Sequence, residues 1–372
     1  MTTVLVTGAS GFLGLNLTTA LQRRTDITVR TCDRSQPLAA LDAALAGVDA
    51  IVHLEAIYRT AREGEFAEVH VGWTRTLLDR LGQSGQVPAI VYASSTQAEG
   101  DSPYGRSRRS AEELLSQYAS ASGASEVLLR LAHEFGKWCR PDDNSVVATF
   151  CDRVARGQDL VIHDPAASLR LMYVDDIVAA ILASMAAPPA GVSFVPVSPV
   201  WPLTVGELAE RIRGFRESRA SLIIPDCADP LTRRLYATYL SHLDGADFAY
   251  SLQKREDPRG SLVEYFKNDH FGQVFVSRTK PGVTRGNHYH DTKVEKFCVL
   301  EGDAVVCFRH LVTGAAVKHT VRGVDATVID IPPGYAHSIE NVGTSEMIVL
   351  FWANEIFDPA RPDTYPREVL RA

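Results

Sequence analysis

The stretch Thr7-Gly8-Ala9-Ser10-Gly11-Phe12-Leu13-Gly14 indicates how the first half of this chain folds. It follows the apolar run Val4–Val6, which is typical of a strand, and it opens the helical pattern of Leu13–Arg23. Its glycines permit a tight turn and a close approach of the backbone to a pyrophosphate at a helix N-terminus. A tight turn without a ligand is the alternative. The residues expected to contact a dinucleotide are Gly8, Ser10, Gly11, Phe12, Leu13 and Gly14.

Two charged residues bear on the choice of dinucleotide. Asp33 and Arg34 follow the predicted strand Val29–Thr31, about twenty residues beyond the glycines. The Asp33 carboxylate is suited to a ribose 2′-hydroxyl, whereas Arg34 is suited to a 2′-phosphate. Both residues are therefore expected to contact the cofactor, and the pair leaves NAD and NADP open.

The rest of the first half alternates strand and helix patterns. Ala50–Val52 and Ile90–Tyr92 are predicted strands, and Thr74–Leu81 between them is a predicted helix. This alternation is typical of a parallel, doubly wound sheet of the Rossmann type. We therefore expect an α/β dinucleotide-binding domain over residues 1–245.

Near residue 245 the pattern changes to short apolar segments divided by Gly and Pro. Such a pattern predicts an all-β domain, either an antiparallel barrel or a jelly roll, over residues 250–372. The region Pro225–Asp244 before it is helical and polar in places. The predicted strands are Gly272–Val276, Lys296–Leu300, Ala304–Phe308, Val317–Val321, Ala326–Ile331 and Glu346–Trp352.

Four residues of this second half, His288, His290, Glu295 and His337, have the types and spacing of a metal site. His288 and His290 are two apart, so on a strand both side chains point to one face of the sheet. The Pro332-x-Gly334 turn before His337 brings a further ligand in from another strand. Three imidazoles and one carboxylate suit a borderline divalent ion, zinc first among them. Ordinary strand histidines, a closed structural ion and an ion open to a substrate carbonyl remain the alternatives.

The composition of the 372 residues excludes several classes of protein. A formal net charge of −7 and the absence of a basic run argue against nucleic-acid binding. Six widely spaced cysteines without a Cys-x-x-Cys motif are typical of reduced thiols in a cytoplasmic protein. No signal peptide and no apolar run of membrane-spanning length is evident.

Several further motifs resemble those of extended short-chain dehydrogenases/reductases, namely the glycine loop, Ser94-Ser95, Tyr104-Gly105 and Tyr173–Asp176. Others resemble a bifunctional capsular-polysaccharide family that joins such a reductase domain to a metal-binding cupin. The likeness extends over nearly the whole chain, in the same domain order. The stretches that carry it are Phe135–Pro141, Asn144–Phe150, Gly286–His290, Phe357–Pro359 and Pro362–Tyr365.

The resemblance implies a two-step reaction on a nucleotide sugar. In that family the cupin epimerises C3 of a UDP-4-keto-6-deoxy-N-acetylhexosamine. The reductase domain then reduces C4 with NADPH, which yields a UDP-N-acetyl-6-deoxy-L-talosamine. The resemblance also implies one divalent metal and a homo-oligomer, a dimer or a tetramer.

Residue by residue, the resemblance assigns three positions to catalysis. Ser95 matches the residue that polarises the keto oxygen, and Tyr104 matches the proton donor to the developing alkoxide. Arg108 stands where the family has a lysine that lowers the tyrosine pKa and holds the nicotinamide ribose. Arginine is planar and effectively never deprotonated, so this exchange is not conservative. His53 and Leu54 match cofactor-contacting residues that follow the fourth predicted element.

Two more departures lie near the cofactor. The family's His-Leu-Ala-Gly is His53-Leu54-Glu55-Ala56 here, and its Pro-Asn is Ala132-His133. These departures leave three hypotheses: a working epimerase and reductase, a cupin isomerase whose first domain has lost hydride transfer, and a non-catalytic nucleotide-sugar or dinucleotide-binding protein.

A few side chains are secondary candidates. An epimerase needs a proton acceptor and donor, and Tyr289, Lys296, His310 and Tyr335 are titratable residues near the metal motif. Lys137, Arg140 and Arg170 are suited to a diphosphate, with a solvated surface role as the alternative. Trp138 either stacks on a uracil or fills the core.

Overall fold

The computed structural model describes residues 2–62 and 64–369, which form two compact units. The first runs as far as Arg213 and includes Asp229–Asp244. The second consists of Gly214–Ala228 and the chain from Gly245 onward. The contacts of residues 214–228 thus group them with the second unit, whereas the sequence suggested a single change near residue 245.

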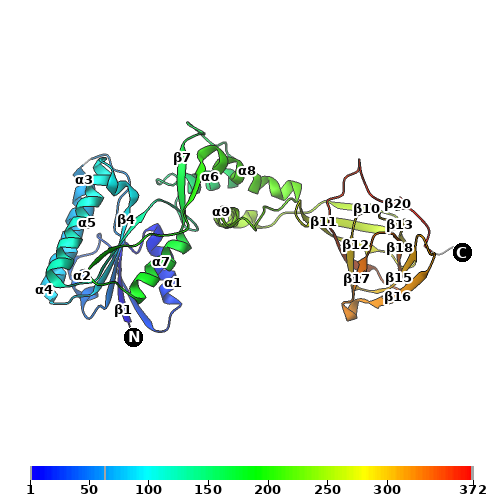
Figure 1. The fold of residues 1–372 in the computed structure, drawn as a ribbon, viewed down its shortest axis with the longest axis horizontal. Helices are drawn as coiled ribbons and strands as arrows, with labels where there is room; N and C mark the ends of the chain where they lie inside the picture. Colours follow the sequence, from blue (N-terminus) through cyan, green and yellow to red (C-terminus); the bar gives the residue numbers. More distant parts are fainter. Residues whose placement is uncertain (1, 63, 370–372) are drawn as a thin grey trace. The chain divides into compact units, whose positions relative to one another are not determined.

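The first unit is built on a six-stranded parallel sheet in the order β2-β1-β3-β4-β5-β8 (Figure 1). This order confirms the predicted doubly wound α/β fold, because the chain reverses direction across the sheet after β2. The predicted strands are all present. The bounds are β1 Thr2–Thr7, β2 Ile27–Cys32, β3 Ala50–His53, β4 Ala89–Ser95, β5 Glu126–Leu131 and β8 Val192–Phe194.

Helices cover both faces of this sheet (Figure 1). Helices α1 and α7 pack on one face over alternate strand residues such as Val4 and Val52, and α2, α4 and α5 pack on the other over Leu5 and Ile51. Alternate residues of a strand point to opposite faces, so the continuous apolar strands supply two cores. The bounds are α1 Phe12–Gln22, α2 Leu38–Leu45, α3 Gly64–Ala67, α4 Trp73–Ser84, α5 Pro103–Ser122 and α7 Val174–Ala186, with a π-helical turn at Glu68–Gly72 and a 3-10 turn at Thr96–Glu99.

The chain before residue 250 also contains a smaller sheet and further helices. Strands β6, β7 and β9 make a separate sheet in which β7 lies between the other two. The region predicted to be helical before residue 244 contains α9, which Asp229 caps by accepting bonds from two backbone N–H groups. The bounds are β6 His133–Phe135, α6 Val146–Ala155, β7 Ser168–Tyr173, β9 Trp201–Thr204, α8 Val205–Ser221, α9 Pro230–Ser241 and a 3-10 turn at Gly245–Phe248.

The second unit is all-β, as predicted, and consists of two antiparallel sheets (Figure 1). Their orders are β10-β11-β12-β19-β14-β17 and β16-β15-β18-β13-β20, and their facing sides enclose a core that includes Phe297, Val306 and Ile339. Several adjoining strands, such as β12 with β19 and β13 with β18, are distant in sequence, which is the jelly-roll pattern. The bounds are β10 Lys254–Asp257, β11 Gly260–Asn268, β12 Gly272–Thr279, β13 Thr284–Tyr289, β14 Glu295–Glu301, β15 Asp303–His310, β16 Ala316–Arg322, β17 Val328–Ile331, β18 Tyr335–Asn341, β19 Met347–Ala353 and β20 Tyr365–Pro366, with a 3-10 turn at Gly323–Asp325.

The sequence analysis missed some strands of this unit for identifiable reasons. All four residues of β10 are exposed and charged, so the strand has no apolar pattern. A β-bulge between Glu264 and Phe266 interrupts the alternation of β11. A second bulge lies between Gly286 and His288, and β13 ends at Tyr289, so His290 lies just beyond the strand on which it was predicted.

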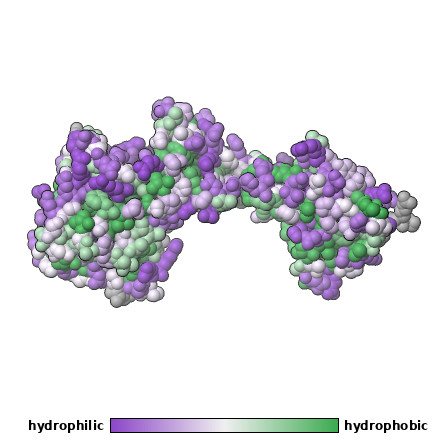
Figure 2. Space-filling model, viewed as in Figure 1, coloured by the Kyte–Doolittle hydropathy of each residue, from purple (hydrophilic) through white to green (hydrophobic). Residues whose placement is uncertain are grey.

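The surface is mixed in character. On the face drawn in Figure 2, hydrophobic residues form separate small patches among hydrophilic ones on each unit. Across residues 2–62 and 64–369, none of the helices combines the length and the apolarity that crossing a bilayer requires.

A buried carboxyl group at the start of β5 makes stability depend on pH. Glu126 is 1% exposed and neither of its side-chain oxygens has a partner among the described residues. Burial, together with the nearby Glu112 carboxylate, raises its pKa to about 8. The folded protein therefore binds this proton more tightly than the unfolded chain, whose value is near 4.5.

From this shift we predict that stability falls as pH rises through the window from about 4.5 to about 8. One pKa unit corresponds to about 1.4 kcal/mol, so between pH 6 and pH 9 the loss should be of the order of a few kcal/mol. The Glu126→Gln variant cannot ionise and should lose less. Urea unfolding at both pH values measures the difference, and equal losses in the two proteins would contradict the prediction.

Candidate active sites

The predicted reductase residues converge at the carboxyl ends of the parallel strands. Ser95 is the last residue of β4, and Tyr104 and Arg108 lie one turn apart on α5. The Ser95 side chain also accepts a bond from the Gln97 backbone N–H, which caps the following 3-10 turn. In open α/β sheets ligands bind at this edge, so the three residues lie where this fold binds its ligands.

The Tyr104 phenol lies beside Ser95 in a buried setting. Burial raises its pKa, and the nearby Glu134 carboxyl acts in the same direction, whereas Arg108 and a hydrogen bond with Ser95 lower it. The net shift is upward. Tyr104 therefore holds its proton at neutral pH, which is the state a proton donor needs.

The Arg108 side chain packs against the sheet, which differs from the position expected for the family's lysine. It is 3% exposed, its Nη2 donates to the Ala93 carbonyl of β4, and its guanidinium carbon lies 4.8 Å from the centroid of the Tyr92 ring. Its Nε and Nη1 have no hydrogen-bond partner among the described residues. The planar group is thus held against the sheet, and its other two donor atoms are buried there.

Sequence reasoning missed several residues that surround Tyr104. The rings of Tyr58, Phe66 and His70 have centroids 5.4 to 6.2 Å from that of Tyr104. His70 belongs to the π-helical turn, and its Nδ1 lies 2.7 Å from the Ser107 hydroxyl. Such turns are frequent at functional sites but have no signal in a hydrophobic pattern. Glu134 was missed too; burial raises its pKa to about 7, although Arg108 opposes this.

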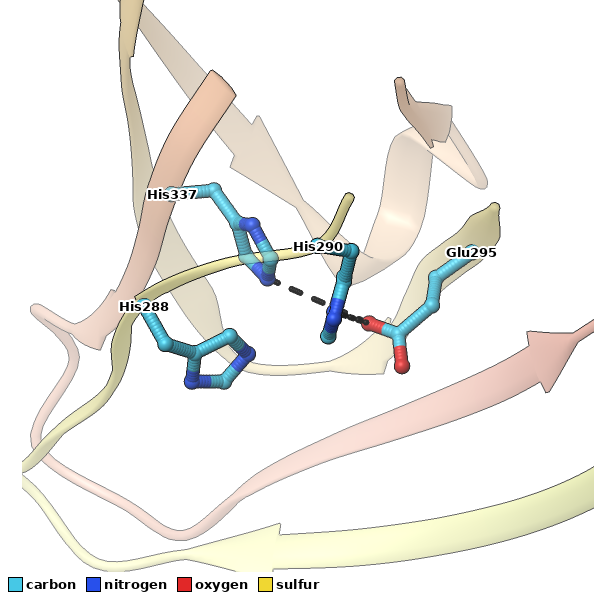
Figure 3. Close-up of side chains that lie close together, drawn as sticks. All are labelled: His288, His290, Glu295 and His337. Carbon is cyan, nitrogen blue, oxygen red and sulfur yellow. Dashed lines mark ion pairs between the residues drawn. The ribbon is translucent and has the colours of Figure 1, made fainter. Parts of the chain in front are cut away.

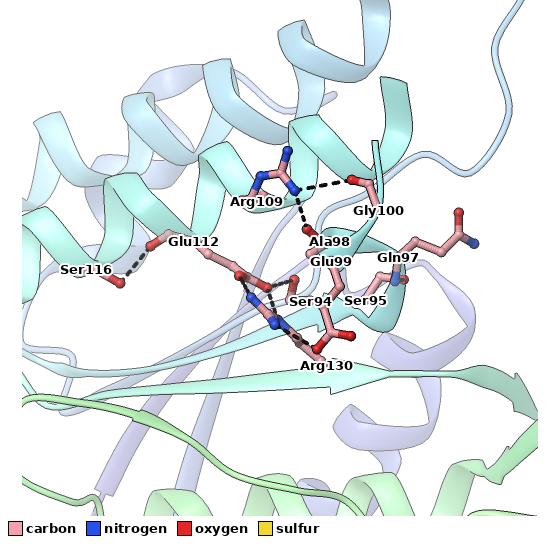
Figure 4. A network of polar contacts seen from close by, with 10 residues as sticks. All are labelled: Ser94, Ser95, Gln97, Ala98, Glu99, Gly100, Arg109, Glu112, Ser116 and Arg130. Atoms are coloured by element: carbon pink, nitrogen blue, oxygen red, sulfur yellow. Dashed lines mark hydrogen bonds and ion pairs between the residues drawn. The ribbon is translucent and has the colours of Figure 1, made fainter. Parts of the chain in front are cut away.

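A buried ionic network supports the loop that follows Ser95 (Figure 4). Both carboxylate oxygens of Glu112 accept bonds from the guanidinium of Arg130, at 3.0 and 2.6 Å, and Ser94 donates to the same carboxylate. Arg130 also reaches Glu99, and Arg109 donates to the carbonyls of Ala98 and Gly100. These bonds tie the 3-10 turn to α5 and β5 and so fix Ser95.

The glycine loop has the shape that a pyrophosphate requires. Gly8 has φ +69°, and a Cβ there would lie 2.8 Å from the Glu55 nitrogen; a Cβ at Gly14 would lie 2.6 Å from Ala9 Cα. The first helix begins at Phe12 without a side-chain cap. The two glycines thus allow close packing of the backbone around the turn, and the uncapped start of α1 leaves backbone N–H groups for a pyrophosphate, which fits a dinucleotide.

The adenosine end of the loop holds the charged residues predicted for it. Asp33 and Arg34 follow β2, and one buried Asp33 oxygen has no partner among the described residues. His53 ends β3, but its ring nitrogens lie 2.7 Å from the Thr7 hydroxyl and 2.9 Å from the Thr74 hydroxyl. Burial lowers the His53 pKa to about 3. A contact of His53 with a dinucleotide would therefore come from its main chain.

The four predicted metal ligands lie together in the second unit (Figure 3). One donor atom from each of His288, His290, Glu295 and His337 lies within 4.8 Å of all the others. An ion bound at roughly 2 Å to each ligand spans up to about 4 Å between ligands, so small adjustments suffice.

The chemistry of the donor set also fits a metal. His290 Nδ1 lies 2.6 Å from the Asp363 carbonyl, so it carries the proton, and its buried Nε2 has no hydrogen-bond partner and lies 3.4 Å from Glu295. Burial lowers the His337 pKa to about 3 and also lowers the pKa of His288. Neutral imidazoles and one carboxylate are the protonation states that bind zinc.

Asp363 holds the loop that carries His290 and Glu295. Its carboxylate accepts bonds from the backbone N–H groups of Asp291, Thr292 and Lys293, at 2.7 to 2.9 Å. Burial opposes the charge, yet these bonds lower the Asp363 pKa to about 2. The ligand loop is thus fixed by a residue some seventy positions away.

The four predicted metal ligands line a cavity of about 280 Å³ within the second unit. One wall is apolar and includes Phe275 and Phe351, whose rings stack with centroids 4.8 Å apart. The other lining residues are rich in charge: Arg255, Arg259, Arg285, Lys293 and Glu264. Burial and the neighbouring Arg259 lower the pKa of Arg285, so a bound anion would relieve repulsion between them.

Comparison with known proteins finds relatives for both units. The sequence matches the NAD dependent epimerase/dehydratase family over residues 4–195 and the polysaccharide biosynthesis C-terminal domain over residues 255–365. It is 40% identical over 362 residues to UDP-2-acetamido-2,6-beta-L-arabino-hexul-4-ose reductase of Pseudomonas aeruginosa, which covers 97% of each chain. This chain belongs to the NAD dependent epimerase/dehydratase family.

Two solved structures are similar to this epimerase/dehydratase-family enzyme over nearly its whole length. The crystal structure of the capsular polysaccharide assembling protein CapF from Staphylococcus aureus matches it with a TM-score of 0.92 at 41% identity, over 98% of this chain and 100% of that one. A structure of CapF with the inhibitor 3-isopropenyl-tropolone matches with a TM-score of 0.87 at 38% identity, over 99% and 100% of the two chains. The predicted resemblance to bifunctional capsular-polysaccharide enzymes is confirmed.

Other candidates lie outside the metal cavity of this family member. None of Tyr289, Lys296, His310 and Tyr335 lines it. Lys296 pairs with Asp330, and the His310 ring accepts bonds from backbone N–H groups of the next turn. Lys293 lines the cavity and donates to the Pro362 carbonyl. Sequence analysis missed it because it lies between two strands and belongs to no recognisable motif.

The three basic residues predicted to contact a diphosphate are either paired with a carboxylate or exposed at the surface. Lys137 pairs with Asp175 at 2.5 Å, and Arg140 and Arg170 are exposed. Trp138 is 47% exposed with φ 68°, so the interpretation that it fills the core is wrong. The left-handed backbone at that position turns the ring outward.

We predict that the wild-type protein purifies with about one divalent ion per chain, most readily zinc, and that His290→Ala releases it. Because a structural site couples metal binding to folding, the variant should melt at a lower temperature. Elemental analysis and thermal unfolding measure the two effects. His319→Ala on the exposed strand β16 is the control. A wild type without stoichiometric metal would defeat the prediction.

Proposed function

We propose that this enzyme acts on a UDP-linked 4-keto-6-deoxyhexosamine, epimerising C3 in the cupin-like second unit and reducing C4 in the first. The observation that carries the proposal is the cavity in which His288, His290, Glu295 and His337 meet a set of arginines. The 40% identity to an enzyme named as a reductase of a UDP-linked hexul-4-ose supports the substrate class.

The residues of the cavity suit a nucleotide sugar. Arg255, Arg259 and Arg285 offer guanidinium groups to a diphosphate, and the apolar wall offers packing for a deoxy sugar. A divalent metal held by the four ligands would polarise the keto oxygen. The Lys293 ammonium, bonded to Pro362 and Thr364 oxygens, is fixed where it can stabilise a developing oxyanion.

Epimerisation beside a ketone needs a base for the α-proton. Glu264 on β11 is the carboxylate outside the metal set among the residues lining the cavity, and it pairs with Arg255 at 3.4 Å. We assign removal of the α-proton to Glu264; a proton from solvent, delivered to the opposite face of the resulting enolate, completes the epimerisation.

The test of the epimerase half is solvent deuterium uptake at C3 of a UDP-4-keto-6-deoxy-N-acetylhexosamine. Glu264→Gln should lower the exchange rate by roughly 100-fold or more, a typical share for a positioned base, while the metal content stays unchanged. Glu346→Gln is the matched control, since Glu346 also pairs with an arginine, at 3.5 Å, but lies outside the cavity. Absence of exchange in the wild type would reject the epimerase half.

In the first unit, Ser95 and Tyr104 are suited to polarise the ketone and donate the proton, and a nicotinamide dinucleotide would supply the hydride. The setting of Arg108 favours a second candidate, a cupin isomerase with a weak reductase. Its guanidinium is bonded to a β4 carbonyl and stacked on Tyr92, so it is not free to hold a ribose as a lysine would.

This second candidate predicts that reduction is slow or absent in the wild type and that Arg108→Lys raises its rate by about tenfold, a fraction of what a positioned acid contributes. Exchange at C3 should not change. The fall in absorbance of the reduced dinucleotide, in the presence of the 4-keto substrate, measures the rate. Arg80→Lys, which alters an arginine paired with Asp42, is the control. Brisk wild-type reduction that Arg108→Lys slows would instead make Arg108 an adapted catalytic residue. Assembly into a dimer or tetramer stays a prediction.

A further inference from the structure

Glu55 lies at the edge of the sheet where the glycine loop turns. It comes two residues after β3, and the Leu54 N–H donates to the Thr7 carbonyl at 3.1 Å, which continues the contact between β3 and β1. The Glu55 nitrogen lies against Gly8, where a Cβ would be only 2.8 Å away. A side chain at position 55 therefore borders the dinucleotide site directly.

The Glu55 carboxylate is fully engaged with Arg34. One oxygen lies 3.2 Å from Arg34 Nε, and the other accepts from the Arg34 backbone N–H at 3.3 Å. The Glu55 side chain is 10% exposed, whereas that of Arg34 is 44% exposed. Burial raises the pKa of Glu55 and the contacts with Arg34 oppose that shift. The pair is thus a specific, partly buried contact and not a chance surface ion pair.

The Arg34 guanidinium is the group that a 2′-phosphate needs. In this fold the residues after the second strand meet the adenosine ribose, and a nearby arginine accommodates the 2′-phosphate of NADP. A phosphate monoester carries nearly two negative charges at neutral pH. Here it would meet Asp33 and Glu55 with a single guanidinium that Glu55 already neutralises. A ribose 2′-hydroxyl, by contrast, can donate to the unpartnered Asp33 oxygen.

We infer that Glu55 makes the first unit select NAD(H) over NADP(H), because it pairs with the Arg34 guanidinium through Nε and adds a second carboxylate beside Asp33. The inference rests on the proposed function, since it requires that the glycine loop binds a nicotinamide dinucleotide. It assigns to one side chain a choice of cofactor that Asp33 and Arg34 alone left open.

The experiment is calorimetric titration of the full-length protein with NADH and with NADPH. The wild type should bind NADH at least about tenfold more tightly, which corresponds to one charge-assisted contact. Glu55→Ala should free Arg34 and tighten NADPH by about tenfold, with a smaller effect on NADH. Glu55→Gln fills the same space without charge and should also tighten NADPH, which separates charge from steric hindrance.

A double variant tests the role of Arg34. In Glu55→Ala combined with Arg34→Ala, the gain in NADPH affinity should disappear, because the freed guanidinium is what binds the phosphate. A gain that persists without Arg34 would overturn the inference. Thermal unfolding of each variant verifies that the fold is retained.

The outcomes also separate this inference from the proposed function. Wild-type protein that binds NADPH as tightly as NADH, or more tightly, overturns the inference and leaves the proposed reductase standing. Protein that binds neither dinucleotide, as wild type and as Glu55→Ala, overturns both the inference and the reductase half. The epimerase half is measured by deuterium exchange and is unaffected by either result.

Discussion

The close approach of backbone to backbone at Gly8 and Gly14 is the constraint on which the first unit depends. No side chain fits at either position, because Glu55 and Leu54 lie against one glycine and Ala9 against the other. The ends of β1 and β3 and the start of α1 therefore meet at one point. That meeting brings Glu55 within reach of Arg34, although the two lie twenty-one residues apart.

The two candidate sites carry different charges. The difference follows from which charged side chains each site buries. In the first unit, Arg108 is buried with two unpaired donors beside Tyr104, while Asp33 and Glu55 make the adenosine end anionic. In the second, arginines and Lys293 surround the metal ligands in a cavity whose net character suits an anion. A buried charge without a partner is unfavourable, so each arrangement points to the charge of its ligand.

Long-range contacts position the chemistry in both units. Asp363 holds the loop between His290 and Glu295 through three backbone N–H groups, and Glu112 and Arg130 tie down the turn after Ser95. In each case a carboxylate satisfies groups that a loop would otherwise leave unpaired. The candidate catalytic and metal-binding side chains thus lie on short segments that neighbouring strands and helices hold in place.

The sequence by itself determined the α/β and all-β halves, the glycine loop and the metal quartet, because each rests on local spacing: strand–turn–helix order, and ligands two residues apart or after a Pro-Gly turn. Only the tertiary structure decided which side chains share a space. It joined Glu55 to Arg34, gathered Tyr58 and His70 around Tyr104, and put Glu264 rather than Lys296 in the metal cavity. These contacts join segments distant along the chain, and a bulge or a left-handed residue alters direction without a local pattern.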